Sequence, residues 1–331
     1  MQAVDFDKLF NQFATVKIGV VGDVMLDTYW WGHVERISPE APVPVVSLDK
    51  KEYRIGGAGN VALNLAALGA TVNIFSVIGR DDDGNVLREM LNKNSIGNAY
   101  LLASSDRITT NKARIMSRNQ QMMRLDNETT LDLASPDEDS IINAVAKYIE
   151  TERPQVIIFE DYNKGVLTSN VISAIIELCK KNKIVTAVDP KRKNFFSYKD
   201  VDIFKPNLKE VREGLNLLVD QINLVTLQGI HEQLEEKLHH HISFITLSDK
   251  GVFFQDNKEA KIIPSHLRNI ADVSGAGDTV IAVAALIYSL TKNVELMASV
   301  ANLAGGLVCE EVGTVAVNKR SLLNECKSLL N

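Results

Sequence analysis

Short apolar runs alternate with longer amphipathic stretches along most of the chain. The run at residues 16–21 is β-branched and ends at Gly22-Asp23, which is typical of a buried strand. A short amphipathic stretch at 6–14 predicts a helix before it. Similar apolar runs predict strands at 72–78, 156–159, 184–188, 201–204 and 244–247. Helical patterns occupy 60–68, 85–91, 136–149, 170–181, 208–215, 276–290, 294–310 and 318–330. This alternation predicts an α/β fold, a mainly parallel sheet flanked by helices on both faces.

Two stretches interrupt the alternation. Residues 28–55 and 107–126 are rich in β-formers, and the first contains Pro39, Pro42 and Pro44, which favour edge strands and turns. They predict a small antiparallel sheet inserted into one large domain that spans 1–331. Such an insert can cover a ligand site as a β-lid or join two subunits, and the pattern leaves both roles open.

Composition excludes several classes of function. The chain has 331 residues and a formal net charge of −6, so no basic face is expected for nucleic acid or an anionic membrane. No apolar run approaches the roughly 18 residues that span a bilayer, and no signal peptide is evident at the N-terminus. Cys179, Cys309 and Cys326 are scattered, which favours neither disulfides nor a zinc site. A cytoplasmic location is therefore expected.

A glycine-rich turn, Asp272-Val273-Ser274-Gly275-Ala276-Gly277-Asp278, precedes an apolar helix of small residues. Backbone N–H groups at the start of such a helix form an anion hole suited to phosphate oxygens. Asp278 is placed in the first turn, where a carboxylate can accept the proton of an attacking hydroxyl. On the turn alone, an acid that merely complements the helix dipole remains the alternative.

A second glycine-rich turn lies at 56–64. Gly57, Gly59 and Ala62 satisfy the G-x-G-x-x-A dinucleotide fingerprint, so a nicotinamide oxidoreductase is an alternative. That fingerprint normally follows a buried strand, whereas residues 50–55 are polar. The side-chain amides of Asn60 and Asn64 are suited to binding sugar hydroxyls, although a capping role stays open for each.

Together the two turns resemble those of the ribokinase-like, or PfkB, carbohydrate kinases. That family has a di-glycine turn followed by an asparagine, here Gly56-Gly57 and Asn60, and a D-x-x-G-A-G-D turn, here 272–278. The resemblance covers nearly the whole chain. It includes Asn207-Leu208-Lys209-Glu210, the family's N-x-x-E motif, and a loop at 246–251 near the nucleotide. It implies a ribokinase-like fold with an inserted β-lid, ATP and Mg²⁺ as cofactors, and phosphoryl transfer to a sugar.

Within the family, residues 22–30 and 36–45 are similar to kinases that phosphorylate D-glycero-β-D-manno-heptose 7-phosphate at the C1 hydroxyl. Residues 161–165 and 188–193 belong to the same resemblance. It implies a role in nucleotide-activated heptose biosynthesis for lipopolysaccharide, and a homodimer formed through the β-lid. The usual relative carries a nucleotidyltransferase domain after the kinase, and since this sequence ends at Asn331, a separate nucleotidyltransferase is expected. A kinase of another sugar or sugar phosphate, and a non-catalytic sugar-binding module, remain alternatives.

The resemblance, together with the placement of charged and polar residues, assigns a role to each candidate residue. Asp278 is expected to be the general base, with the N–H groups of Gly275, Ala276 and Gly277 stabilising the transferred phosphoryl group. The expected substrate-binding residues are Asp23, Asp27, Gly57, Asn60, Arg118, Asp189, Lys191 and Lys193. The expected nucleotide-binding residues are Asn207, Glu210, Ser248, Gly251 and Asn302, with Glu210 also at the metal.

Basic residues suggest where the phosphate of the acceptor binds. Lys191-Arg192-Lys193 follows the predicted strand at 184–188, at the carboxyl end where open α/β sheets bind ligands. Arg114, Arg118 and Arg124 in the second inserted stretch are further candidates. They lie on one face of the sheet if the strand is unbroken. A turn near Asn119-Gln120 would interrupt the alternation, and the three arginines would then not have to share a face.

Other side chains allow weaker predictions. Asp27 is expected to hold sugar hydroxyls, and Asp23 either shares that task or serves as a strand-end turn residue. Residues 239–241 are all histidines, which point about 100° apart on a helix and cannot converge on one metal ion. A polar helix end is expected there. Trp30 and Trp31 face opposite sides of a strand, so at most one stacks on a sugar.

Overall fold

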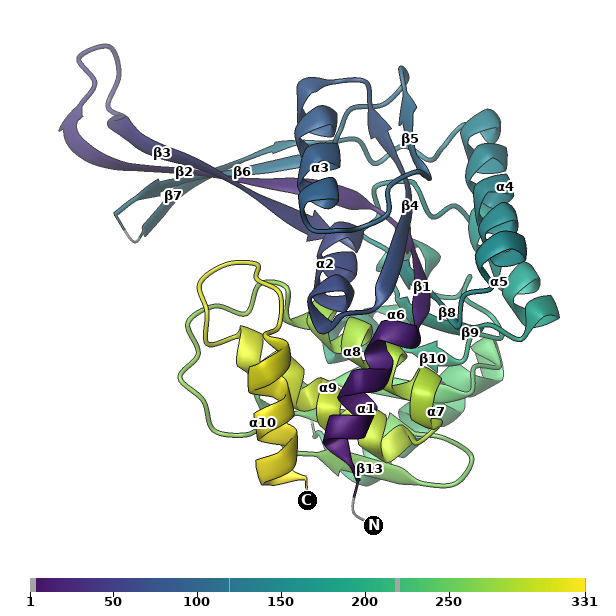
Figure 1. Cartoon of the computed structure of the whole chain (residues 1–331). Coiled ribbons are helices and arrows are strands. Elements are labelled where there is room, and N and C mark those ends of the chain that lie inside the picture. The colour runs from purple at the N-terminus through teal and green to yellow at the C-terminus, as the bar shows by residue number, and fades with distance from the viewer. Residues whose placement is uncertain (1–3, 119, 218–220, 331) are drawn as a thin grey trace.

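A computed structural model describes residues 4–118, 120–217 and 221–330 of the chain. Within them a nine-stranded sheet has the order β13-β12-β11-β10-β9-β8-β1-β4-β5 (Figure 1). Its strands are β1 (Lys17–Gly22), β4 (Thr71–Gly79), β5 (Leu101–Ser104), β8 (Val156–Glu160), β9 (Val185–Asp189), β10 (Ile203–Phe204), β11 (Ile242–Thr246), β12 (Val252–Gln255) and β13 (Ala260–Ile263).

The pairing confirms a mainly parallel sheet. All neighbours from β5 to β11 run parallel, and only β12 and β13 are antiparallel additions at one edge. β1 lies at the centre, with Gly19 level with Asn73 on β4 and with Ile157 on β8. The chain builds outward from β1 through β4 and β5, then returns to the other side through β8. The carboxyl ends of β1 and β8 therefore form a topological switch point, where ligands bind in open α/β sheets.

Helices cover both faces, as predicted. They are α1 (Phe6–Gln12), α2 (Ala58–Leu68), α3 (Asp82–Lys93), α4 (Ser135–Glu152), α5 (Ser169–Asn182), α6 (Leu208–Leu215), α7 (Leu224–Leu238), α8 (Ala276–Thr291), α9 (Val294–Val308) and α10 (Lys319–Leu329). Apolar side chains of α1, α2, α3, α8, α9 and α10 join one hydrophobic core. Those of α4, α5, α6 and α7 join a second core on the other face. Helix α8 is apolar nearly all round, which is why it is buried at the centre of its layer.

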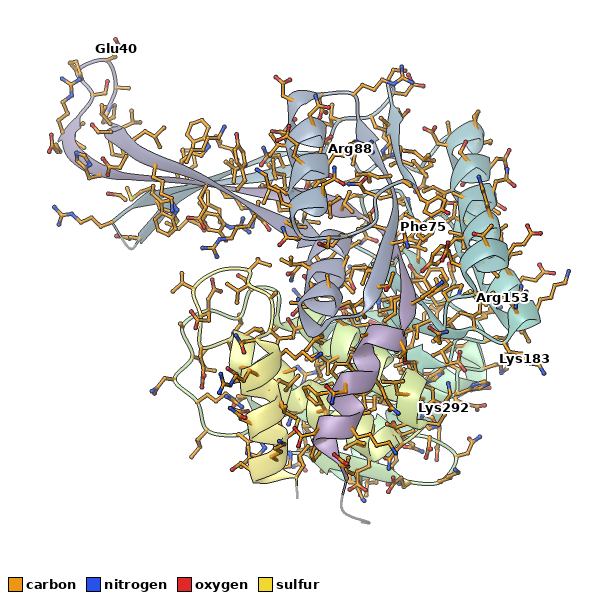
Figure 2. All side chains as sticks on the ribbon, in the orientation of Figure 1. Glu40, Phe75, Arg88, Arg153, Lys183 and Lys292 are labelled. Atoms are coloured by element: carbon orange, nitrogen blue, oxygen red, sulfur yellow. The ribbon has the colours of Figure 1, made fainter. Side chains whose placement is uncertain are left out.

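The inserted stretches form a second sheet, here called the arm. Its strands are β2 (Val24–Ile37), β3 (Pro44–Gly57), β6 (Asn111–Ser117) and β7 (Gln120–Asn127), in the order β3-β2-β6-β7. The arm projects sideways from the body, and Glu40 marks its far end (Figures 1 and 2). The prediction that it is antiparallel holds for β2 with β3 and for β6 with β7, but β2 pairs with β6 in parallel, so the sheet is mixed. Both strands leave the body at the carboxyl edge of the main sheet and so run in the same direction.

Strand register gives the arm two different faces. Asp27 is level with Arg54, Tyr29 with Arg114, and Arg114 with Arg124. We call this side the arginine face, comprising Asp27, Tyr29, Arg54, Arg114 and Arg124. On the other side Trp30 is level with Ile115, Ile115 with Met123, and Gly32 with Leu48. We call it the apolar face, comprising Trp30, Leu48, Ile115, Met123 and Leu125.

The three consecutive histidines only partly match their prediction. His239 ends α7 in a left-handed conformation and is exposed, as is His241. His240 is buried instead, and its Nε2 lies 2.6 Å from the Ser243 hydroxyl, which also lies 2.9 Å from Nδ1 of His231. The short link between α7 and β11 turns this side chain into the core against Phe204. Throughout the described ranges, no helix combines the length and apolar character needed to cross a membrane.

Candidate active site

The candidate site lies at the switch point of the main sheet. Asp23 follows β1, Glu160 ends β8 and Asp189 ends β9. The N-termini of α2 and α8 approach from one side, because these two helices pack against each other in the same layer. Residues more than two hundred positions apart in the sequence meet there.

The glycine turn before α8 is held by Asp272. One carboxylate oxygen of Asp272 accepts hydrogen bonds from the N–H and hydroxyl of Ser274, at 3.0 and 2.8 Å, and the other accepts from the N–H of Gly313 at 2.9 Å. Gly275 has φ +79°, and a Cβ on it would lie 2.8 Å from Nδ2 of Asn60, so glycine is required on both counts. Ala276 and Gly277 lie in the first helical turn, whose N–H groups have no intrahelical carbonyl partner, and the Ala276 N–H donates only a long 3.3 Å bond to the carbonyl of Val273. The turn has the form of the predicted anion hole.

Asp278 is buried at the start of α8, and both of its carboxylate oxygens are bound. Nδ2 of Asn60 donates to Oδ2 at 2.8 Å, and the hydroxyl of Tyr162 donates to Oδ1 at 2.7 Å. Burial raises the pKa of Asp278 to about 6, although these two hydrogen bonds act in the opposite direction. The carboxylate is thus ionised at neutral pH and more basic than an exposed aspartate, which suits a general base.

A network of amides fixes Asn60 in place. Asn64, one turn later on α2, donates to the backbone carbonyl of Asn60 at 2.9 Å. Its Oδ1 accepts from the Thr279 hydroxyl at 3.1 Å and from the Val317 N–H at 2.9 Å. Asn64 therefore ties α2 to α8 and orients Asn60, a structural role in place of the predicted hydroxyl binding.

The junction of β3 and α2 brings the backbone close to the site. Gly57 has φ +58°, and a Cβ there would lie 2.3 Å from the backbone oxygen of Asp23. A Cβ on Gly56 would lie 2.5 Å from Oδ2 of Asp27. Both glycines are therefore required for close approach of the chain to the two aspartates.

Asp23 and Asp27 have different surroundings. Asp23 accepts three backbone hydrogen bonds, from Tyr162 at 2.8 Å, Lys164 at 3.0 Å and Val166 at 3.1 Å, so it anchors the loop after β8. This arrangement favours the turn-residue alternative for Asp23. Asp27 lies on the arginine face and accepts a hydrogen bond from Arg114, and it is positioned to contact a ligand at the base of the arm.

Three buried carboxylates lie together beneath the anion hole. One carboxylate oxygen from each of Glu160, Asp189 and Asp278 lies within 4.8 Å of those from the other two. Asp189 is bound by the ammonium groups of Lys205 at 2.7 Å and Lys191 at 3.2 Å. Burial raises the pKa of Asp189, but the two lysines outweigh it and leave the pKa below its ordinary value.

Glu160 is unlike its neighbours. In the described part of the chain neither of its carboxylate oxygens has a hydrogen-bond partner, and the side chain is fully buried. Burial, together with the nearby charges of Asp189 and Asp278, raises the pKa of Glu160 well above its ordinary value. Buried carboxylate oxygens without a hydrogen-bond partner are suited to binding a divalent cation, because Mg²⁺ is bound in proteins through carboxylate and other oxygen ligands.

The N-x-x-E motif forms a capping box at the start of α6. Asn207 accepts from the N–H of Glu210 at 2.9 Å, and Oε2 of Glu210 accepts from the N–H of Asn207 at 2.8 Å. Oε1 of Glu210 is bound to the Lys191 ammonium at 2.7 Å. Both carboxylate oxygens of Glu210, the predicted metal ligand, are thus already hydrogen-bonded. The carboxylate oxygens of Glu160 have no such partner and are more available to a metal ion.

Several predicted residues lie outside this cluster. Lys193 is half-exposed and paired with Asp132. Arg118 is exposed at the turn between β6 and β7, and it lies six residues beyond Lys112, the residue level with Asp27, or about 20 Å away. Ser248 and Gly251 belong to the turn after β11, both with positive φ, and Asn302 on α9 donates to the carbonyl of Pro264 at 2.9 Å.

Three residues of the cluster escaped the sequence analysis. Glu160 is the last residue of its strand, so the rule that ligands bind at carboxyl ends could have indicated it. Tyr162 lies in a motif already noted at 161–165. Lys205 carries no local signal, because its pairing with Asp189 depends on β10 lying beside β9 in the sheet.

Comparison with known proteins now identifies the family. A model described as pfkB family carbohydrate kinase matches residues 16–320. The bifunctional protein HldE of Sulfurimonas denitrificans is 38% identical over 314 residues, which is 94% of this chain and 64% of that protein. HldE of Aliarcobacter butzleri is 40% identical over 296 residues, 89% of this chain and 61% of that protein. The chain thus spans less than two thirds of the length of these relatives.

Solved structures agree on the fold. Phosphofructokinase-2 from Escherichia coli in complex with potassium superposes with a TM-score of 0.80 at 17% identity, covering 96% of this chain and 100% of that one. Arabidopsis thaliana ribokinase complexed with ribose and ATP gives a TM-score of 0.71 at 16% identity, covering 93% and 98%. At such identities the likeness shows the ribokinase-like fold alone. From the family match and the HldE relatives, the chain belongs to the pfkB family of carbohydrate kinases.

Proposed function

We propose that the protein transfers the γ-phosphoryl group of ATP to the C1 hydroxyl of D-glycero-β-D-manno-heptose 7-phosphate, giving the 1,7-bisphosphate for nucleotide-activated heptose synthesis. The observation that carries phosphoryl transfer is Asp278, a buried, hydrogen-bonded carboxylate beside a glycine turn that opens a helix. The choice of acceptor rests on the resemblance of residues 22–30 and 36–45 to heptose 7-phosphate kinases.

In the proposed reaction Asp278 accepts the proton of the C1 hydroxyl. The sugar oxygen forms a bond to the γ-phosphorus while the bond from that phosphorus to the bridging oxygen breaks, and ADP leaves. The N–H groups of Gly275, Ala276 and Gly277 stabilise the charge on the transferred group. Asn60 and Tyr162 keep the base in position because each binds one of its oxygens.

Magnesium suits the same site. Glu160 and Asp189 are the side chains that would hold the ion, directly or through water, because they supply carboxylate oxygens next to the base. When bound with ATP, the ion neutralises phosphate charge. Lys205 lies beside this group, with its Nζ 3.8 Å from where a Cβ of Gly277 would be, and adds positive charge under the anion hole.

Homodimerisation through the arm is part of the proposal. The apolar face exposes about half of the surface of Leu48, Met123 and Leu125, at 55%, 55% and 47%. An apolar patch of this kind on a projecting sheet is suited to packing against a second copy.

The experiment is an ATP-consumption panel of paired sugars and sugar phosphates, run with and without magnesium. Heptose 7-phosphate should give the highest kcat/KM, and the product should carry its new phosphate at C1 by ³¹P NMR. Preference for a different sugar would contradict the proposed acceptor while retaining a kinase. Absence of ATP turnover with every sugar, together with a fluorescence change on adding NADH, would instead favour the nicotinamide alternative.

A further inference from the structure

The arginine face of the arm carries two guanidinium groups on the ring of Tyr29. The Arg54 guanidinium carbon lies 4.9 Å from the ring centroid and that of Arg114 lies 5.2 Å from it. Both side chains are largely buried, at 20% and 19% exposure. Stacking on an aromatic ring holds a guanidinium plane in a fixed orientation, which reduces the entropy lost when it binds a ligand.

Both arginines retain unused donors. A guanidinium has five N–H bonds. Arg54 donates from Nε to Glu52 at 2.8 Å and from Nη1 to the carbonyl of Val312 at 2.7 Å. Arg114 uses only Nη1, for Asp27 and for the carbonyl of Lys112. Within the described ranges, Nη2 of Arg54 and both Nε and Nη2 of Arg114 have no acceptor.

The loop at 312–314 contacts both Arg54 and the glycine turn at Gly275, so it shows that the two arginines lie near the anion hole. Val312 binds Arg54, and Thr314 lies 3.1 Å from where a Cβ of Gly275 would be. Two residues span at most about 7 Å, so one small molecule can reach from the arginines to the glycine turn. Gly313 between them has φ +74°, and a Cβ there would lie 2.1 Å from Nη1 of Arg54, so the loop leaves room for the guanidinium.

The basic cluster at 191–193 is poorly placed for the same task. Lys191 is bound to both Asp189 and Glu210, and Lys193 pairs with Asp132 at the surface. A phosphate drawn to Lys191 would have to displace two carboxylates. The arginine face instead has N–H donors available on Arg54 and Arg114, and it includes Asp27, the predicted ligand of sugar hydroxyls.

We propose that Arg54 and Arg114, stacked on Tyr29, bind the phosphate monoester already carried by the acceptor sugar. This rests on the proposed function, in which the acceptor is a sugar phosphate, and adds the residues that recognise it. A forked guanidinium suits phosphate oxygens because two parallel N–H groups can bind at once. The reacting hydroxyl and the phosphate then occupy opposite ends of the site, at Asp278 and at the arm.

The test compares Arg54→Gln with the matched control Arg124→Gln. Arg124 lies on the same face, level with Arg114, but is half-exposed and bonded to Asp126 through two nitrogens at 2.9 and 3.0 Å. Kinetics are measured with heptose 7-phosphate and with unphosphorylated heptose. Arg54→Gln should raise the KM for heptose 7-phosphate about 10-fold to 100-fold, leaving the KM for ATP and the kinetics with heptose unchanged. Arg124→Gln should match the wild type.

A second variant, Arg54→Lys, keeps the charge without the fork and should give an intermediate KM. Equal KM values for wild type and Arg54→Gln, or a rise in KM confined to Lys193→Gln, would overturn the assignment. If the wild type prefers another sugar phosphate and Arg54→Gln raises its KM, the proposed acceptor is wrong but the assignment holds. If the wild type prefers the unphosphorylated member of every pair, the assignment is overturned as well.

Discussion

At the scale of single residues, burial and hydrogen bonding have opposite effects on the pKa of Asp278. Burial disfavours the carboxylate, while Asn60 and Tyr162 stabilise it, and the resulting pKa is about 6. Below this pH the base holds a proton and cannot accept another. Activity should therefore fall on the acid side with an apparent pKa near 6 in the free enzyme.

Replacing Tyr162 with Phe removes one of the two donors to this carboxylate. Since the bond lowers the pKa of Asp278, its loss should raise that pKa and move the acid limb of kcat/KM upward by about one pH unit. Activity at pH 7 should fall about twofold, because about half of the Asp278 carboxyl would then be protonated, and should recover by pH 8.5. The measurement is a pH profile of both enzymes.

Tyr198→Phe is the control for that comparison. Its hydroxyl binds the buried carboxylate of Asp161 at 2.7 Å, so the variant loses a similar hydrogen bond that does not touch the base. Its acid limb should coincide with that of the wild type. An equal shift of the acid limb in both variants would contradict this assignment. It would mean that a general loss of order in the loop after β8, and not the hydrogen bond to Asp278, determines the pH dependence of kcat/KM.

The sequence allowed some of these residues to be predicted and concealed others. Gly275, Gly277 and Asp278 lie in one short motif, so a local stretch of sequence indicates both the turn and the acid beside it. Glu160 and Lys205 are ordinary residues locally. Their importance arises because parallel strands bring the ends of β8, β9 and β10 together, which no short stretch of sequence records.

At the scale of elements, α7 and β11 share a buried pair of histidines. His240 is held neutral, because burial lowers its pKa from 6.5 to about 3, and the imidazoles of His231 and His240 both bind the Ser243 hydroxyl. The unfolded chain takes up this proton as the pH falls below 6.5, while the folded chain resists it down to about 3. The contribution of neutral His240 to the free energy of unfolding should thus be complete above pH 6.5 and should decrease progressively below that pH.

His240→Gln tests this linkage, since an amide can bind Ser243 without titrating. At pH 5.5 the wild type should have lost about 1.4 kcal/mol through this group alone, and the variant should be spared that loss. The measurement is urea unfolding at pH 7.5 and pH 5.5. Identical pH dependence in the two proteins would contradict the proposed burial of a neutral imidazole.

Periodicity was a good guide to the body and a poorer one to the arm. Apolar runs and amphipathic stretches alternate, and this local signal suffices to predict a parallel sheet between two helical layers. The parallel pairing of β2 with β6 has no such signal, because more than seventy residues separate the two strands. Likewise, the bulge between Trp31 and Gly32 changes which side chains share a face, so Leu48 joins the apolar face.

At the scale of the whole molecule, the arm has two faces with different tasks. The arginine face contacts the loop at 312–314 through Arg54, while Leu48, Met123 and Leu125 on the apolar face are exposed. If two copies pack through the apolar faces, the contacts would hold each arm in position next to its proposed acceptor site. Burial of apolar surface contributes roughly 25 cal/mol per Å², so a few hundred Å² matter.

Met123→Glu places a charge in the middle of the apolar face. The variant should be monomeric by light scattering at concentrations where the wild type is a dimer, because desolvating an unpaired carboxylate is costly. Gln121→Glu, on the same strand and level with Met116, is a surface charge control with no change of mass expected. A wild type that is monomeric throughout would contradict the proposed dimer.

The role of Asp278 as the general base is tested by the activity of Asp278→Asn with ATP and heptose 7-phosphate. The amide preserves shape but cannot accept the hydroxyl proton, so kcat should fall by about 10² or more, with ATP affinity and melting temperature close to the wild type. Wild-type turnover by this variant would contradict the assignment of Asp278 as the base.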